Sequence, residues 1–69
     1  RRQGVGRAVL RGLIELARSK GVRRLSLETG SAALFAPARA MYAAQGFEVC
    51  PPFGSYHPDP LSVFMTRTL

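Results

Sequence analysis

The sequence is short of the residues that usually hold a small fold together. It is 69 residues long and contains one cysteine, Cys50, and one histidine, His57. One cysteine excludes an internal disulfide, and no Cys/His cluster has the spacing of a structural metal site. A chain of this size buries only about 60% of its unfolded surface and is marginal without such links. We therefore expect residues 1–69 to be a single piece of a larger domain.

Acidic residues are also few, and their scarcity is uneven. The net charge is +6, and residues 1–24 hold eight Arg or Lys against one Glu. Residues 25–69 hold two Arg against three acidic residues. A basic segment of this kind suits nucleic acid, an anionic membrane surface or a polyphosphate ligand. Aromatic residues are missing from residues 1–24, which removes the stacking platforms for nucleic-acid bases and makes that partner the weaker alternative.

Targeting signals and long apolar runs are missing from the given residues. The sequence has no signal peptide and no apolar stretch long enough for a membrane span, and it begins inside a motif without an initiator methionine. The expectation is therefore a cytoplasmic fragment with no membrane partner.

What is present is an alternation of helical and strand patterns. On a helical wheel the apolar residues from Val5 to Ala17 gather on one side and the arginines on the other, which predicts an amphipathic helix capped by Gly21. Gly12 is expected to mark a close contact within this helix. The patterns that follow predict a strand at 23–29, a helix at 38–45 closed by Gly46, a strand at 47–50, a Pro-rich loop at 51–60 and a strand at 61–67.

The stretch of residues 1–7, Arg-Arg-Gln-Gly-Val-Gly-Arg, stands at the start of the first helix. A helix N-terminus has backbone N–H groups without intrahelical partners, glycines allow a phosphate to approach them, and arginines add positive charge. The dinucleotide fingerprint fails because Val9 stands where its third glycine would fall, and the Gly-Lys-Ser/Thr of a nucleotide P-loop is absent. Gly4 and Gly6 alone are also typical of a flexible turn that merely starts a helix.

Two further signatures follow in order: Ala38-x-x-Met41-Tyr42-x-x-x-Gly46-Phe47, and the run from Tyr56 to Met65. Together with Arg1-x-x-Gly4-x-Gly6 they resemble the GNAT superfamily of acetyl-CoA-dependent N-acetyltransferases. The resemblance covers nearly all 69 residues and implies the C-terminal half of a GNAT α/β fold, in the order α-β-α-β-β with a three-stranded mixed sheet. Within it, residues 1–20 would be the coenzyme-binding turn and helix, and residues 21–69 the remaining sheet and helix.

The resemblance also implies an activity and its residues. The activity is transfer of acetyl from acetyl-CoA to a primary amine by direct attack on the thioester, without a metal. The pyrophosphate would be held by the backbone and side chains of Arg1, Arg2, Gln3, Gly4, Val5, Gly6 and Arg7. Tyr42 would protonate the leaving thiolate, a general-acid role that can contribute about 10²–10⁴-fold, although a tyrosine there also suits the core. Glu28, at the end of the first strand, could deprotonate the incoming ammonium or could be a solvated strand end.

For other residues the sequence predicts a role or a location less specifically. Tyr56 is a rival to Tyr42 and better placed for the acceptor site, His57 is expected on the surface, and Cys50 is expected to be a small buried apolar residue. Phe35 stands where many relatives have an asparagine that contacts the coenzyme arm.

The expected partners follow from the same reading: an amine acceptor, and either the missing N-terminal half of the domain or a second copy of the chain. The strand containing Leu25 to Glu28 should pair with the last strand on one side and leave its other edge bare. Two alternatives to the enzyme remain open at this point. One is a basic nucleic-acid-binding module, and the other is a catalytically inert interaction fragment.

Overall fold

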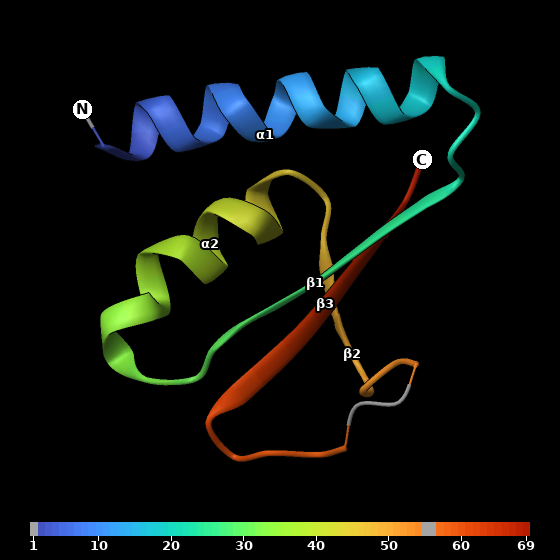
Figure 1. Cartoon of the computed structure of the whole chain (residues 1–69). Coiled ribbons are helices and arrows are strands. Elements are labelled where there is room, and N and C mark those ends of the chain that lie inside the picture. The colour runs from blue at the N-terminus through green and yellow to red at the C-terminus, as the bar shows by residue number, and fades with distance from the viewer. Residues whose placement is uncertain (1, 55–56) are drawn as a thin grey trace.

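The computed structural model describes residues 2–54 and 57–69. In the first helix, side chains are described from Gly4 onward. Its element order is α1 (Arg2–Ser19), β1 (Arg24–Gly30), a 3-10 turn η1 (Ala33–Phe35), α2 (Ala36–Ala44), β2 (Glu48–Cys50) and β3 (Ser62–Thr68). Figure 1 shows α2 lying beneath the N-terminal half of α1, with the strands below α1 and beside α2. The predicted order α-β-α-β-β is confirmed.

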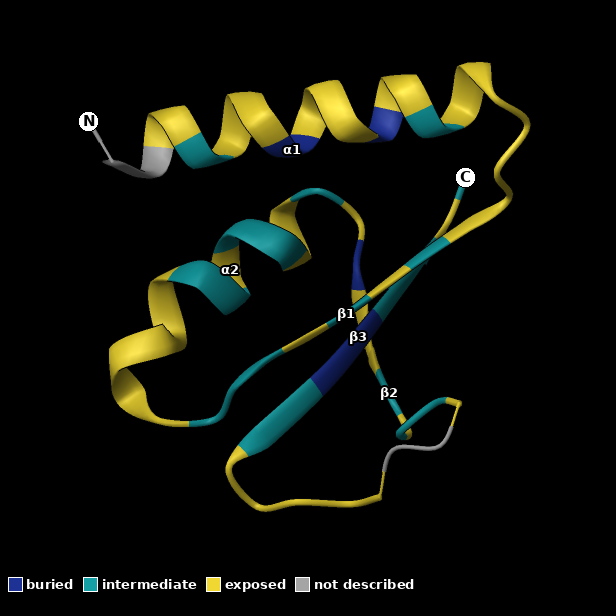
Figure 2. Ribbon diagram, in the orientation of Figure 1, coloured by how far each residue is buried: buried dark blue, intermediate teal, exposed yellow. Residues whose placement is uncertain are grey.

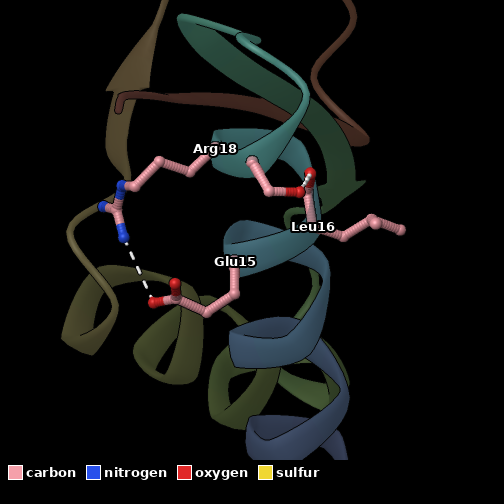
Figure 3. Close-up of polar contacts among 4 residues, drawn as sticks. Glu15, Leu16 and Arg18 are labelled. Carbon is pink, nitrogen blue, oxygen red and sulfur yellow. Dashed lines mark hydrogen bonds and ion pairs between the residues drawn. The ribbon is translucent and has the colours of Figure 1, made fainter.

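The amphipathic pattern of α1 ends where the sequence predicts. The N–H of Val22 donates to the carbonyl of Ala17, and that of Gly21 donates to the carbonyl of Arg18. Gly21 has φ +79°, and this left-handed residue with its two reversed bonds is a Schellman cap. The last turn also holds an Arg18–Glu15 ion pair at 3.2 Å (Figure 3). The close contact expected at Gly12 is wrong, because a Cβ there would meet nothing within 4 Å.

The three strands form one sheet in the order β1-β3-β2. β3 runs antiparallel to both neighbours, with Leu27 opposite Met65 and Val49 opposite the same Met65. The predicted mixed sheet is therefore wrong. β1 and β2 do run in the same direction, but β3 lies between them, so no parallel pair forms. β1 is left at the edge of the sheet with one side unpaired among the described residues.

Alternation along the strands gives the sheet two different faces. We call the first the helix-side face; it is formed by Leu25, Leu27, Val63 and Met65. The core cluster of Leu10, Ile14, Phe47 and Met65 lies there, and Met41 and Tyr42 of α2 pack against it. In Figure 2 the buried parts of α1 are turned toward the strands. Burial of apolar area on this face is the main stabilising contribution to the fold.

The second face, which we call the open face, is formed by Ser26, Glu28, Ser62, Phe64 and Thr66. It is polar except for Phe64, whose ring meets that of Phe53 edge-on with centroids 5.3 Å apart. Phe53 belongs to the Pro-rich loop, so this loop is attached to the face that the helices do not cover. The hydroxyls of Ser26 and Thr66 are hydrogen-bonded to each other at 2.9 Å.

α2 begins after Phe35 and has Pro37 in its first turn, as the sequence predicts for a proline. It ends before Gly46, which has φ +90° and accepts a backbone conformation that L residues rarely adopt. The chain then passes through the buried Phe47 into β2. This short helix thus delivers Met41 and Tyr42 to the core and to the underside of α1.

Candidate coenzyme and acceptor site

The glycine-arginine stretch is helical from Arg2, so the coenzyme-binding turn expected within residues 1–20 does not form as a separate turn over Gln3 to Arg7. In an α-helix each N–H from the fifth residue onward donates to the carbonyl four residues earlier. The N–H groups of Gly6 and Arg7 therefore belong to the helical ladder. Those of Arg2, Gln3 and Gly4 are the ones at the open N-terminus, where the positive end of the helix dipole also lies. Arg1 lies outside the described residues.

Gly4 and Gly6 have different surroundings. A Cβ on Gly6 would lie 3.3 Å from Sδ of Met41, which is tighter than most real contacts. Gly6 therefore lets α1 approach α2 closely. A Cβ on Gly4 would meet nothing within 4 Å. Of the two glycines, Gly4 is the one whose backbone is open to an incoming group, whereas Gly6 has a packing role that the sequence did not indicate.

Two hollows lie along the contact between α1 and α2, and Met41 lines both. The larger has a volume of about 320 Å³ and an almost wholly apolar lining of Gly6, Val9, Leu10, Leu13, Met41 and Tyr42. The smaller, of about 150 Å³, is lined by Arg7, Pro37, Ala40, Met41 and Ala44. A flexible, mostly apolar chain that ends in a phosphate group would find matching surfaces here, with Arg7 exposed beside the smaller hollow.

Tyr42 packs in the core and also lines the larger hollow, and its general-acid role stays a prediction. Its ring packs against the core cluster and meets Phe47 at a centroid distance of 6.0 Å and an interplanar angle of 62°. The same side chain is half-buried and lines the larger hollow together with Gly6. Within residues 2–54 and 57–69, no side-chain hydrogen bond involves its hydroxyl. A phenol in this setting can donate a proton to a group that enters the hollow.

Glu28 lies on the open face, whereas Tyr42 packs on the helix-side face. The structure therefore does not bring these two predicted catalytic residues into one pocket. Glu28 is exposed and accepts a hydrogen bond from the Ser62 hydroxyl at 2.5 Å. Glu28 belongs to β1 at one edge of the sheet, whereas the ring of Tyr42 meets Phe47, which leads into β2 at the other edge.

Three polar residues near the end of β1 were missed by sequence reasoning. Arg39 donates to the carbonyls of Gly30 and Ala32, at 2.6 and 3.0 Å. The other two are Ser31 and Ser62, which connect the ends of β1 and β3. The one available signal was Arg39, the only Arg or Lys between residues 25 and 66. The two serines have no such signal because serine is common in loops.

The remaining candidate residues have different surroundings. Phe35 stands at the end of η1 with its ring against Gly30, where a Cβ would overlap it, so this position supplies an apolar wall and no polar contact. Cys50 is half-buried and lines a hollow of about 200 Å³ with Phe64 and Asp59. His57 is exposed, as predicted, and Tyr56 lies outside the described residues.

Two features are absent from the described part of the chain. No three His, Cys, Asp or Glu side chains gather there as metal ligands. None of its helices combines the length and apolar character that a membrane crossing requires.

Comparison with known proteins decides the family. The model of the acetyltransferase (GNAT) family matches residues 1–47. The chain belongs to the GNAT family. The N-acetyltransferase YsnE of Bacillus subtilis, itself uncharacterized, is 54% identical over 99% of this chain. The IAA acetyltransferase of Azospirillum brasilense is 45% identical over 94% of it.

Solved structures agree with this assignment. An acyl-CoA N-acyltransferase from Klebsiella pneumoniae aligns with the whole chain at a TM-score of 0.86 and 39% identity. The chain covers 46% of that protein, 45% of YsnE and 41% of the Azospirillum enzyme. This GNAT chain therefore spans less than half the length of the relatives that it matches. The fold and family predicted from its motifs are confirmed.

Proposed function

We propose that this GNAT chain carries the coenzyme-binding and part of the catalytic residues of an enzyme that transfers acetyl from acetyl-CoA to a primary amine. The observation that supports this most directly is the larger hollow. It is apolar, and it places Gly6 near the start of α1 and Tyr42 of α2 in one lining. An extended coenzyme that is anionic at one end and carries a thioester at the other fits such an arrangement.

The pyrophosphate would bind at the N-terminus of α1. There the open N–H groups, the helix dipole and the arginines favour an anion. The proposed contacts come from the whole predicted set, namely Arg1, Arg2, Gln3, Gly4, Val5, Gly6 and Arg7. Because the first helical residue is Arg2, the backbone part of this contact is assigned to Arg2, Gln3 and Gly4, and the charge part to the arginines.

The chemistry is a direct acyl transfer. The neutral amine nitrogen attacks the thioester carbonyl, a C–N bond forms, and the C–S bond breaks. The departing thiolate takes a proton from the Tyr42 hydroxyl, which regains one from solvent. The acceptor, which arrives as an ammonium, loses one proton to Glu28 and a second to water as the amide forms. Tyr42 and Glu28 would work from opposite faces of the sheet, so neither needs to contact the other.

The test compares two glycines of α1 in the full-length protein. Gly4 and Gly12 are both helical and exposed, and a Cβ on either meets nothing within 4 Å. Gly4→Val should weaken acetyl-CoA binding by roughly tenfold or more, because the side chain blocks approach to the backbone. Gly12→Val makes the same change in helix propensity away from the proposed site and should leave affinity unchanged. Isothermal titration with acetyl-CoA measures both.

Equal affinity in wild-type protein and Gly4→Val would contradict the pyrophosphate assignment. A single-stranded oligonucleotide, titrated at low and high salt, tests the alternative of a nucleic-acid-binding module. Salt-sensitive oligonucleotide binding without acetyl-CoA binding would favour that alternative. Binding of neither would leave an inert interaction fragment.

A further inference from the structure

A group of hydrogen bonds joins the segment after β1 to the start of β3 on the open face. The N–H of Ser31 donates to the carbonyl of Leu61 at 3.1 Å, and its hydroxyl donates to the carbonyl of Pro60 at 2.5 Å. Ser62, the first residue of β3, lies opposite Gly30, the last residue of β1. The end of β1 and the start of β3 are therefore held together by strand pairing at Ser62 and by the hydrogen bonds of Ser31 to the two residues before it.

Ser62 lies on the same face as Glu28 and diagonally across the strand pair from it. Glu28 is opposite Phe64, and Ser62 is two residues before Phe64. A diagonal pair of this kind is within reach of a long side chain. The Ser62 hydroxyl donates to Oε2 of Glu28 at 2.5 Å. Oε1 of the same carboxylate has no hydrogen-bond partner within the described ranges, and Glu28 is exposed.

The position of Ser62 is itself fixed. Its N–H donates to the carbonyl of Asp59 at 3.0 Å, and a carboxylate oxygen of Asp59 accepts the N–H of Leu61 at 2.8 Å. This tight turn leads the chain into β3. On the β1 side, Arg39 holds the carbonyls of Gly30 and Ala32. Ser62 therefore offers its hydroxyl from a segment whose backbone is held by several hydrogen bonds, as an orienting group requires.

We propose that Ser62 is a positioning residue that holds the Glu28 carboxylate for the acceptor amine. This proposal rests on the proposed function. The Ser62 hydroxyl donates to Oε2 of Glu28, which leaves Oε1 of the same carboxylate to accept an N–H of the ammonium. An exposed glutamate otherwise samples several rotamers, and fixing one of them before the substrate arrives reduces the entropy lost on binding. The site selects a cationic amine, because a carboxylate so held attracts an ammonium and disfavours an anionic group.

The experiment uses steady-state kinetics of the full-length protein, with the acceptor concentration varied. Ser62→Ala should lower kcat/KM for the acceptor by roughly tenfold, the size expected for loss of a hydrogen bond to a charged group. Acetyl-CoA affinity and melting temperature should stay near wild type. Ser62→Thr keeps the hydroxyl and should restore most of the activity. Ser26→Ala is the matched control, since Ser26 is on the same face but bonds the Thr66 hydroxyl.

A double-mutant cycle separates positioning from a structural role. In a Glu28→Gln background the Ser62→Ala change should have little further effect, because the carboxylate that it orients is gone. Equal losses from Ser62→Ala in both backgrounds, or an equal loss in Ser26→Ala, would overturn the positioning role. Failure of the proposed function has a different signature, namely no acetyl-CoA binding in the wild-type protein, and that result overturns both proposals.

Discussion

The two faces of the sheet differ in composition and in what they can do. The helix-side face presents Leu25, Leu27, Val63 and Met65 to the two helices. The core cluster of Leu10, Ile14, Phe47 and Met65 lies between this face and α1. The open face presents Ser26, Glu28, Ser62 and Thr66, and its side chains bond mostly to one another. One face stabilises the fold by burial, and the other holds polar groups in fixed orientations.

This difference matches the two substrates of the proposed reaction. An apolar coenzyme arm gains from the hollow beside Tyr42, and a cationic amine gains from a carboxylate on a polar surface. A division of this kind predicts that changes on the helix-side face affect folding and the leaving group, whereas changes on the open face affect the acceptor.

Removing a buried ring from the helix-side face should give the largest effect. Phe47 is 4% exposed in the core cluster, so Phe47→Ala should lower the free energy of unfolding by about 3–5 kcal/mol. The matched change is Val49→Ala, two residues later and 73% exposed, which should cost about 0.5 kcal/mol or less. Urea denaturation of the full-length protein measures both. Similar losses in the two variants would contradict the placement of Phe47 in the buried core.

Sequence patterns predicted the order of elements and the Gly21 and Gly46 caps, because each depends on local periodicity or on a residue with special backbone freedom. The pairing of β1 with β3 was implied by the family resemblance, and the structure confirms it. They failed at Arg2 to Arg7, where glycines suggested a turn and α1 continues through both. Glycine disfavours a helix by only about 1 kcal/mol, and the contact of Gly6 with Met41 is a tertiary effect.

The site was predicted unevenly for the same reason. Tyr42 and Glu28 were proposed because a motif or a strand end marked them, and their roles stay predictions. Ser31, Ser62 and Arg39 were missed because their importance comes from partners that lie up to 34 residues away in the chain. The assignment of a mixed sheet failed because the direction of β3 between β1 and β2 cannot be deduced from any one strand.

Tyr42→Phe tests whether the helix-side face supplies the group that protonates the leaving thiolate. It removes one hydroxyl and keeps the ring against Phe47, so stability and acetyl-CoA affinity should change little. Turnover should fall by about 10²-fold or more if the phenol protonates the thiolate. The companion change on the open face, Glu28→Gln, should act on kcat/KM for the acceptor. Full turnover of Tyr42→Phe across the pH range would assign this tyrosine to the core alone.

The free edge of β1 gives the smallest expected effect and concerns the 69-residue chain by itself. The N–H of Leu69 donates to the carbonyl of Arg23, and that of Ser31 donates to Leu61. Along an antiparallel ladder, the backbone N–H and C=O groups of successive residues point alternately toward the partner strand and away from it. The odd-numbered residues of β1 therefore point these groups toward β3. The even-numbered residues, Ser26 among them, turn their N–H and C=O groups to the free edge. Such an edge is a template for pairing with another chain.

A row of exposed apolar residues on α1 adds to this edge: Val5, Val9, Leu13 and Leu16 are all more than half exposed. We therefore predict that the isolated chain self-associates through β1. Ser26→Pro removes an outward N–H and leaves the β1–β3 ladder intact, so it should raise the dissociation constant several-fold. Leu27→Pro, with an inward N–H, should instead disrupt the sheet. Sedimentation equilibrium measures association, and far-UV circular dichroism checks the fold of each variant. A folded monomer at tens of micromolar would show that the bare edge does not recruit a second copy.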